Sequence, residues 1–259
     1  MSQQTIFCIN SGNTNTTLAL VNVTLRQCIG SITVPTDSLH ETLVETYTIL
    51  THDISEKIPV ALATVSKQDS PTLSRSIAAL SKTKSVAIVN GASPLPFTIA
   101  YNPLLSLGAD RIADGMHAYI RHPKKNVIII DCGTAVTINM LSADATFRGG
   151  YILPGVATQR RALFHHTALL PEINSSEKTF TSIPASTTDA IIEGTMISVI
   201  GGIEHGIRKL MAHYPDAIIM AGGGGWNALA PHFSLSIDSV ENMTIIGIAL
   251  CEDYRITIF

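Results

Sequence analysis

The stretch VIIIDCGTAVT, residues 127–137, decides the fold of this chain. Its first four residues are apolar and β-branched and predict a buried strand, and Asp131 stands where that strand ends. An ionised carboxylate there is costly unless hydrogen-bond donors, a polar ligand or a cation meet it. Gly133 lets the backbone approach an anion closely, and Thr134 adds a hydroxyl donor. The stretch therefore predicts a strand, a phosphate-binding turn and a second strand, and it indicates a phosphotransferase.

The same order of elements is predicted near the start of the chain. Residues 9–14, INSGNT, and residues 130–134, IDCGT, both give an apolar residue, Asn or Asp, a small residue, glycine, and threonine within two positions. Each turn lies among three predicted strands that helical sequence follows, which indicates an internal duplication with two similar hairpin turns facing each other. The expected strands lie at 6–9, 17–23, 29–34, 60–65, 86–89, 127–131, 136–141, 147–153 and 217–220, and the expected helices at 38–51, after Pro71, at 109–121 and at 190–211.

This duplicated pattern matches the ribonuclease H-like architecture of the actin, hexokinase and sugar kinase superfamily. We expect an α/β fold with two ribonuclease H-like (actin-like ATPase) halves, mixed sheets flanked by helices, and a nucleotide cleft between the halves. The N-terminal half is expected at residues 1–121 and the C-terminal half at residues 122–259. Such a resemblance predicts architecture and no particular reaction.

Composition narrows the kinds of partner. The net charge is −3 and no run of basic residues is longer than a pair such as Lys124-Lys125, which argues against a nucleic-acid-binding surface. With 46% hydrophobic and 14% charged residues and no continuous apolar run of eighteen residues, we expect a soluble protein with no membrane span. The four cysteines are far apart in sequence, and no secretory signal is visible at the N-terminus. These features predict a cytoplasmic protein whose partner is a small molecule.

A second acidic motif, GADR at residues 108–111, precedes the predicted helix at 109–121. With it, motifs over most of the chain resemble those of the type III pantothenate kinases, bacterial enzymes that phosphorylate pantothenate in the first step of coenzyme A synthesis. The matching segments are Asn10–Thr14, Tyr101–Pro103, Gly108–Arg111, Asp131–Thr137, Gly149–Gly155 and Thr187–Ile191.

The resemblance implies a role for each matching residue. Asp110 would be the general base that takes the proton of the substrate hydroxyl. Asp131 would bind the divalent metal, directly or through water. The substrate-binding residues would be Tyr101, Gly108, Arg111 and Thr187, the last supplied across the interface of a homodimer. The phosphates would be held by Asn10, Gly12, Asn13, Thr14, Gly133 and Thr134. The cofactors implied are ATP, Mg²⁺ and a monovalent cation, K⁺ or NH₄⁺.

The glycine run at residues 222–225 follows a predicted strand and precedes the sole tryptophan. Its position favours contact of Gly222 and Gly223 with adenosine, because bare backbone accommodates a flat ring. A flexible strand-to-helix turn is the alternative.

Each candidate residue also suits an ordinary structural role. Asp110 suits a helix N-terminus, Asp131 suits a turn, Arg111 an ordinary ion pair, and Tyr101 a core position. Thr187 is a good N-cap for the helix expected after it. The residues alone leave these structural roles open.

One position departs from the family pattern. The first motif of the family has aspartate where this chain has Asn10, which keeps an oxygen ligand but lacks the charge. A non-catalytic or regulatory paralogue on the kinase scaffold is therefore one alternative function. A kinase of another small alcohol is the second.

Overall fold

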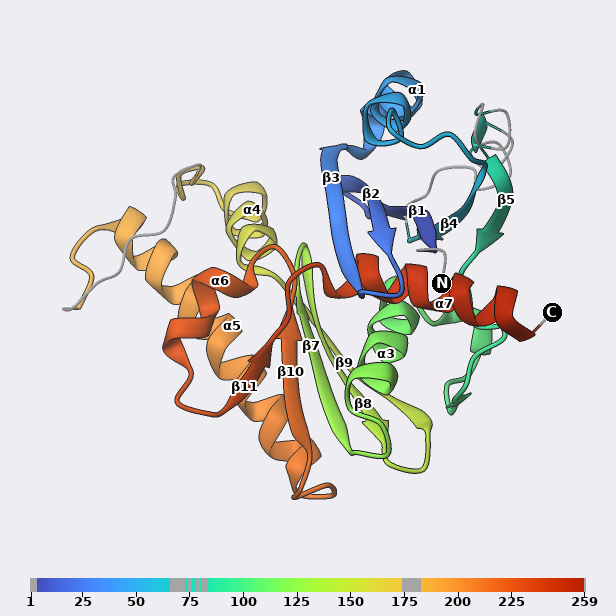
Figure 1. Ribbon diagram of the computed structural model, residues 1–259. Helices are drawn as coiled ribbons and strands as arrows, with labels where there is room; N and C mark the ends of the chain where they lie inside the picture. Colours follow the sequence, from blue (N-terminus) through green and yellow to red (C-terminus); the bar gives the residue numbers. More distant parts are fainter. Residues whose placement is uncertain are drawn as a thin grey trace. The chain divides into compact units, whose positions relative to one another are not determined.

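A computed structural model describes residues 4–65, 73, 76, 77, 80, 83–173 and 183–258 (Figure 1). It contains two mixed β-sheets flanked by helices, so the α/β class predicted from the sequence is confirmed. The first sheet has the strand order β3 (Gln27–Pro35), β2 (Asn15–Asn22), β1 (Thr5–Ser11), β4 (Ile58–Thr64) and β5 (Thr83–Ile88). The second has the order β11 (Ile237–Ser239), β10 (Ile218–Gly222), β7 (Val127–Cys132), β8 (Ala135–Ser142), β9 (Thr146–Pro154) and β6 (Thr98–Ile99).

The two sheets repeat one topology. In the first, β1 pairs antiparallel with β2 and parallel with β4, and β4 pairs parallel with β5. In the second, β7 neighbours β8 on one side and pairs parallel with β10 on the other, and β10 pairs parallel with β11. Reading β7 to β11 as the counterparts of β1 to β5 gives the same strand order in both sheets. The order agrees with the duplication predicted from the two turns.

The helices are α1 (Leu39–Leu50), α3 (Ala109–Arg121), α4 (Val156–His166), α5 (Thr187–Met211), α6 (Trp226–Leu229) and α7 (Met243–Ile258). Short 3₁₀ turns span Thr36–Ser38, Leu104–Ser106 and Ala230–His232. The helix predicted after Pro71 falls mostly outside the described residues, although Leu73, Ile77 and Leu80 are described and buried.

The chain divides into two compact units. Unit 1 comprises Met1–Lys124, Leu141–Gly149 and Asn242–Phe259, and unit 2 comprises Lys125–Met140 and Gly150–Glu241. The prediction of two halves that meet between residues 121 and 122 is not tested by this grouping and stays a prediction.

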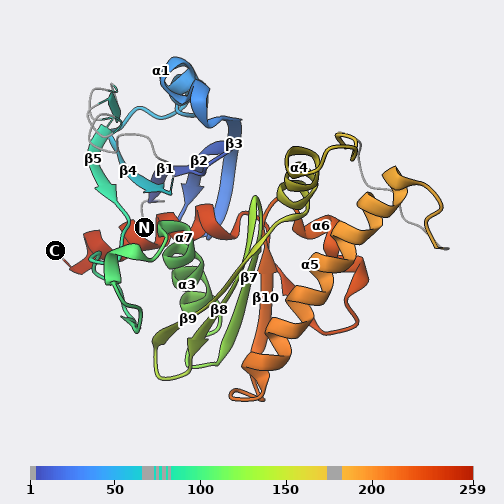
Figure 2. The same ribbon diagram turned by 180° about the vertical axis from the view of Figure 1, so that it is seen from behind.

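Unit 1 has its core between α1 and the first sheet. Phe7 of β1 meets Tyr47 of α1 edge to face, with ring centroids 4.9 Å apart, and both side chains are fully buried. Helix α7 covers the other face of this sheet and also packs against α3 (Figures 1 and 2). The last helix of the chain therefore links the first sheet to α3.

Unit 2 has its core between α5 and the second sheet. Ile128 and Ile130 of β7 pack with Val199 and Ile203 of α5, and all four side chains are buried. Of the described helices, α5 alone is long and apolar enough to cross a membrane, and 44% of its apolar stretch is buried. Helices in the core of soluble proteins share these properties, and α5 contributes to a core, so this is weak evidence for a membrane span.

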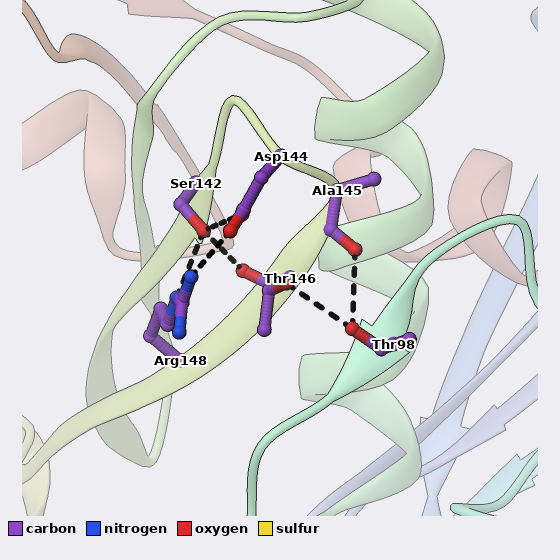
Figure 3. Close-up of polar contacts among 6 residues, drawn as sticks. All are labelled: Thr98, Ser142, Asp144, Ala145, Thr146 and Arg148. Carbon is purple, nitrogen blue, oxygen red and sulfur yellow. Dashed lines mark hydrogen bonds and ion pairs between the residues drawn. The ribbon is translucent and has the colours of Figure 1, made fainter.

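The hairpin that joins β8 to β9 is held by polar contacts (Figure 3). The Asp144 carboxylate accepts hydrogen bonds from Ser142 and, at 2.6 Å, from Arg148, and Arg148 also donates to the Ser142 hydroxyl at 2.9 Å. Thr98 of β6 donates to the Thr146 hydroxyl at 3.2 Å. This cluster anchors the strand that carries Phe147.

Candidate functional site

The first candidate phosphate turn joins β1 to β2. Asn10 is the next-to-last residue of β1, and Gly12, Asn13 and Thr14 form the connection. The N–H of Gly12 donates to the carbonyl of Asn15 at 3.0 Å, and the residues from 13 to 15 are exposed. The structure therefore brings the four predicted phosphate-binding residues of the N-terminal half into one turn with solvent access.

The second turn, between β7 and β8, is similar to the first but one residue shorter, since only Gly133 and Thr134 connect the strands. Asp131 is the next-to-last residue of β7, as Asn10 is of β1, and the N–H of Gly133 donates to the carbonyl of Ala135 at 3.0 Å. Gly133 and Thr134 are exposed and Asp131 is partly buried. Burial and the neighbouring Asp131 raise the pKa of the Cys132 thiol to about 12, which makes that thiol unreactive at neutral pH.

The glycine-rich loop lies directly beside Asp131. Gly222 ends β10 opposite Asp131 in the parallel ladder, and Gly225 donates its N–H to the Cys132 carbonyl at 2.8 Å. Gly223 has φ +93°, and a Cβ there would clash with Asp131 Oδ1 and come within 2.6 Å of the Cys132 N and O atoms. Only glycine fits against the carboxylate here, so the loop and the second turn form one group in unit 2.

Trp226 supports this loop from the core. Its side chain is buried, its ring stacks on Phe233 with centroids 5.5 Å apart, and its Nε1–H donates to the Ser239 hydroxyl at 2.9 Å. These contacts anchor Trp226, the residue that follows the glycine-rich loop, in the core of unit 2.

The N-terminus of α3 carries the second acidic motif. Gly108 occupies the N-cap position, and the N–H of Arg111 donates to Asp110 Oδ1 at 2.8 Å. Burial raises the pKa of Asp110, although the hydrogen bond and the charge of Arg111 lower it in part. A Cβ on Gly108 would clash with the same carboxylate oxygen. A carboxylate with a raised pKa at a confined position has the properties of a general base.

The guanidinium of Arg111 lies over two aromatic rings. Its guanidinium carbon is 5.2 Å from the centre of the Tyr101 ring and 6.0 Å from that of Phe147, and its Nη1 donates to the Tyr101 hydroxyl at 3.3 Å. The backbone of Gly149 packs closely against Tyr101, since a Cβ there would lie 3.2 Å from the ring. The rings hold a buried guanidinium beside Asp110, and guanidinium groups bind carboxylates through paired hydrogen bonds.

Sequence reasoning missed Phe147, and it named Gly149 only as part of a matching segment, without its contact with Tyr101. Both residues come from β9, far from the GADR motif in the chain, and only the pairing of β6 with β9 brings them near Tyr101. No local pattern carries that signal.

A pocket of about 390 Å³ opens beside the start of α3 within unit 1. It is lined at the ends of the parallel strands β4 and β5 and by the turn before α3, and its walls include Thr64, Val89, Asn90, Leu107 and Gly108. The carboxyl ends of parallel strands are the usual place for ligands in open α/β sheets.

Thr187 is the first residue of α5 and is exposed. The alternative that it caps this helix is wrong, because Ser186 is the N-cap and its hydroxyl accepts the N–H of Asp189 at 3.1 Å. The Ser186 hydroxyl also donates to the Asp189 carboxylate at 2.8 Å. Thr187 is not needed as the cap.

One known protein family shares these motifs. The family profile described as type III pantothenate kinase matches residues 6–209, which include both turns, the GADR motif and Thr187. The chain belongs to the type III pantothenate kinase family. The resemblance recognised in the sequence is therefore confirmed.

Curated relatives of the family have moderate identity to this chain. The type III pantothenate kinase of Herminiimonas arsenicoxydans is 35% identical over 145 residues, which are 55% of this chain and 56% of that protein. The type III pantothenate kinase of Janthinobacterium sp. strain Marseille is 37% identical over 145 residues, 55% of each chain. The matches thus span just over half the length of these relatives.

Solved structures support the fold. A Campylobacter jejuni protein named for the Baf family of transcriptional activators superposes with a TM-score of 0.62 at 19% identity, covering 97% of this chain and 99% of that one. The activator of 2-hydroxyisocaproyl-CoA dehydratase from Clostridium difficile, solved with bound ADPNP, gives a TM-score of 0.52 at 11% identity, with 98% and 97% covered. These likenesses extend over nearly the whole chain and confirm the predicted actin-like architecture.

Type III pantothenate kinases use ATP, and their metal has a candidate ligand in this chain. Among the residues that the structure describes, no three His, Cys, Asp or Glu side chains gather into a metal site. Asp131 is a single carboxylate at an exposed turn, held in place by Gly223. Mg²⁺ in phosphate sites keeps several waters and takes one or two carboxylates plus substrate phosphates, so this donor fits Mg²⁺ carried by a nucleotide.

Proposed function

We propose that this protein transfers the γ-phosphate of ATP to pantothenate and forms 4'-phosphopantothenate, the first step of coenzyme A biosynthesis. The observation that carries the proposal is the group at the start of α3. There a partly buried Asp110 with a raised pKa adjoins a buried arginine whose guanidinium lies over two aromatic rings. The family membership of the chain supports the same reaction.

Asp110 is the proposed general base. It accepts the proton of the primary hydroxyl of pantothenate while that oxygen forms a bond to the γ-phosphorus and the bond from the γ-phosphorus to the leaving ADP oxygen breaks. Phosphoryl transfer has a loose transition state, so alignment of the hydroxyl matters more than the strength of the base. The confinement of the Asp110 carboxylate by Gly108 and by the Arg111 N–H supports such an alignment.

Arg111 and Tyr101 are the proposed partners of the carboxylate end of pantothenate. The guanidinium fork suits a carboxylate, and the Arg111 guanidinium is positioned by its contacts with the Tyr101 and Phe147 rings. The pocket beside Gly108 offers a mixture of apolar and polar walls for the rest of the acceptor.

The two turns are the proposed phosphate sites. Asn10, Gly12, Asn13 and Thr14 would hold one part of the triphosphate, and Gly133 with Thr134 the other. Asp131 would contact Mg²⁺ directly or through water, and the metal supplies charge neutralisation on the phosphate oxygens. Gly222 and Gly223 would lie against the adenosine.

Further features of the family are carried over as proposals. The nucleotide would bind in a cleft between the halves 1–121 and 122–259. A monovalent cation, K⁺ or NH₄⁺, would assist the phosphates. A homodimer would bring the exposed Thr187 of one copy to the substrate of the other, and the protein would act in the cytoplasm without nucleic acid or membrane partners.

Asn10 motivates a second candidate function. The loss of a charge about 4 Å from a cation removes about 4 kcal/mol at an effective dielectric constant of 20, before desolvation offsets part of it. A protein weakened in this way would bind nucleotide or pantothenate without turnover and act as a regulatory paralogue. A kinase that accepts another small alcohol is the third candidate.

The test is ATP- and Mg²⁺-dependent phosphorylation of pantothenate, with the product identified by its mass, in the presence and absence of K⁺. The parent chain is compared with Asp110→Asn and Asn10→Asp. Turnover in the parent that Asp110→Asn abolishes supports the proposal. Turnover seen only in Asn10→Asp identifies a chain silenced at its metal side, and no turnover in either chain argues for a binding or regulatory role or for another acceptor.

A further inference from the structure

In each half, the residue that follows β3 or its counterpart β9 forms a hydrogen bond to the phosphate turn. Strand β3 ends at Pro35, and the next residue, Thr36, donates its N–H to the carbonyl of Thr14 at 3.0 Å. Strand β9 ends at Pro154, and the next residue, Gly155, donates its N–H to the carbonyl of Thr134 at 3.0 Å. The two bonds occupy equivalent places in the duplicated topology.

In each half a threonine hydroxyl adds a second bond. The Thr36 hydroxyl donates to the Gly12 carbonyl at 2.8 Å, and the Thr158 hydroxyl, from the first turn of α4, donates to the Thr134 carbonyl at 2.6 Å. Thr36 is 3% exposed and also lies 3.1 Å from the Thr16 hydroxyl, so its position is well defined. In the second half Gly155 packs so closely under the turn that a Cβ would lie 2.9 Å from the Thr134 oxygen.

These bonds determine where the turns direct their N–H groups. The C=O and the following N–H of a trans peptide point in opposite directions, and the only cis peptide bond in the described chain joins Asn102 and Pro103. Holding the carbonyls of Gly12 and Thr14 toward Thr36 therefore directs the N–H groups of Asn13 and Asn15 away from it. The same argument applies to the N–H of Ala135 in the second turn.

We propose that Thr36 and Thr158 are paired positioning residues for the nucleotide phosphates, one behind each turn. Their hydroxyl groups hold turn carbonyls inward, so that backbone donors are presented to the phosphate oxygens before the ligand arrives. Neither residue touches the ligand. This inference rests on the proposed role of the turns in nucleotide binding and is independent of which alcohol accepts the phosphate.

The energetic effect expected is that of one hydrogen bond that orients a binding loop. Such bonds contribute modestly to affinity, and loss of one corresponds to about a three- to ten-fold increase in Kd. Valine has nearly the volume of threonine but no hydroxyl, whereas serine keeps the hydroxyl and loses a methyl group. The Val and Ser variants at each position thus separate the hydrogen bond from packing.

The experiment measures binding of ADP with Mg²⁺ to the full chain by ligand-observed NMR titration, together with the KM values for ATP and pantothenate. Matched controls are Thr33→Val, whose hydroxyl pairs with that of Thr17 on the exposed side of β3, and Thr167→Val, whose hydroxyl binds the Leu163 carbonyl at the end of α4. Thermal denaturation of every variant establishes that it is folded at the assay temperature.

Thr36→Val and Thr158→Val are expected to weaken ADP binding and raise the KM for ATP by about three- to ten-fold, with the KM for pantothenate unchanged and the Ser variants near the parent. An affinity equal to that of the control variants overturns the inference, as does a Ser variant as weak as its Val counterpart. A parent chain that binds no ADP overturns it too. A parent that binds ADP but does not phosphorylate pantothenate refutes the proposed acceptor alone, and the Kd series then decides this inference.

Discussion

Replacement of Gly223 by alanine tests whether the glycine-rich loop positions Asp131. The new Cβ would lie 2.6 Å from both the N and the O atom of Cys132 and closer still to Asp131 Oδ1. An ordinary contact is 3.4 Å or more, so the Cys132 backbone or the loop has to move by about 0.8 Å. Gly223 also has φ +93°, a conformation that costs a residue with a side chain about 1–2 kcal/mol.

Two readouts follow from this geometry. The strain predicts a Tm lower by roughly 2–8 °C. The displacement of Asp131 predicts a fall in kcat of up to about 100-fold, since errors of about 1 Å in a phosphoryl-transfer site are that costly. The assay is pantothenate phosphorylation at 25 °C over a series of Mg²⁺ concentrations, where weakened metal binding raises the concentration needed for half-maximal rate.

Gly224→Ala is the matched control. Gly224 lies next in the same loop, and a Cβ there would meet no atom within 4 Å. We expect this variant to keep the parent Tm and Mg²⁺ dependence. Equal activity and Mg²⁺ dependence in the two alanine variants would refute the reasoning that Gly223 holds the carboxylate in place.

Further outcomes are expected at the acceptor side. Asp110→Asn is expected to abolish turnover and also to raise Tm at neutral pH, because a raised folded-state pKa means that the ionised carboxylate costs stability above the unfolded-state pKa. In the parent, kcat/KM for pantothenate is expected to rise with pH through the elevated pKa of Asp110, and a profile that is flat between pH 4 and 8 contradicts its role as base. Tyr101→Phe removes the hydroxyl that accepts from Arg111 and is expected to raise the KM for pantothenate by about three- to ten-fold with little change in the KM for ATP, measured by steady-state kinetics. Thr187→Val is expected to raise the KM for pantothenate in a chain that sediments as a dimer; analytical ultracentrifugation that finds only monomer would contradict the proposal of a shared site.

The elements around both turns were predictable because their patterns are local. Residues 127–130 form a continuous apolar run, and the structure places them in β7, buried in the core. Helix α7 carries no such signal, since its residues from Ile245 to Glu252 are all buried and one-sided periodicity is lost. The two-residue strand β6 and the three-residue strand β11 are too short for any pattern to reveal.

In the candidate site, too, some features were predictable from a local motif and others depend on the tertiary structure. Asp110 and Arg111 are neighbours in one motif, so the sequence sufficed to name them. The raised pKa of Asp110 and the second ring beside Arg111 depend on burial and on Phe147, which only the tertiary structure supplies. Residue types therefore indicate which chemistry is available, whereas the properties that make a group effective come from residues distant in sequence.

The duplication gives particular weight to the one departure from the family pattern. Asn10 and Asp131 hold equivalent positions at the ends of β1 and β7, and each is followed by a glycine-containing turn that leads into an adjacent strand. Turn carbonyls are held by hydrogen bonds in both halves: Thr36 binds those of Gly12 and Thr14, and Gly155 with Thr158 binds that of Thr134. The backbone of the first turn therefore remains built for phosphate even though its carboxylate is an amide. The retained geometry argues that the first turn still binds phosphate, which both the kinase and the regulatory paralogue require. The two differ in turnover, which depends on the charge missing at Asn10, so the comparison of the parent with Asn10→Asp separates them.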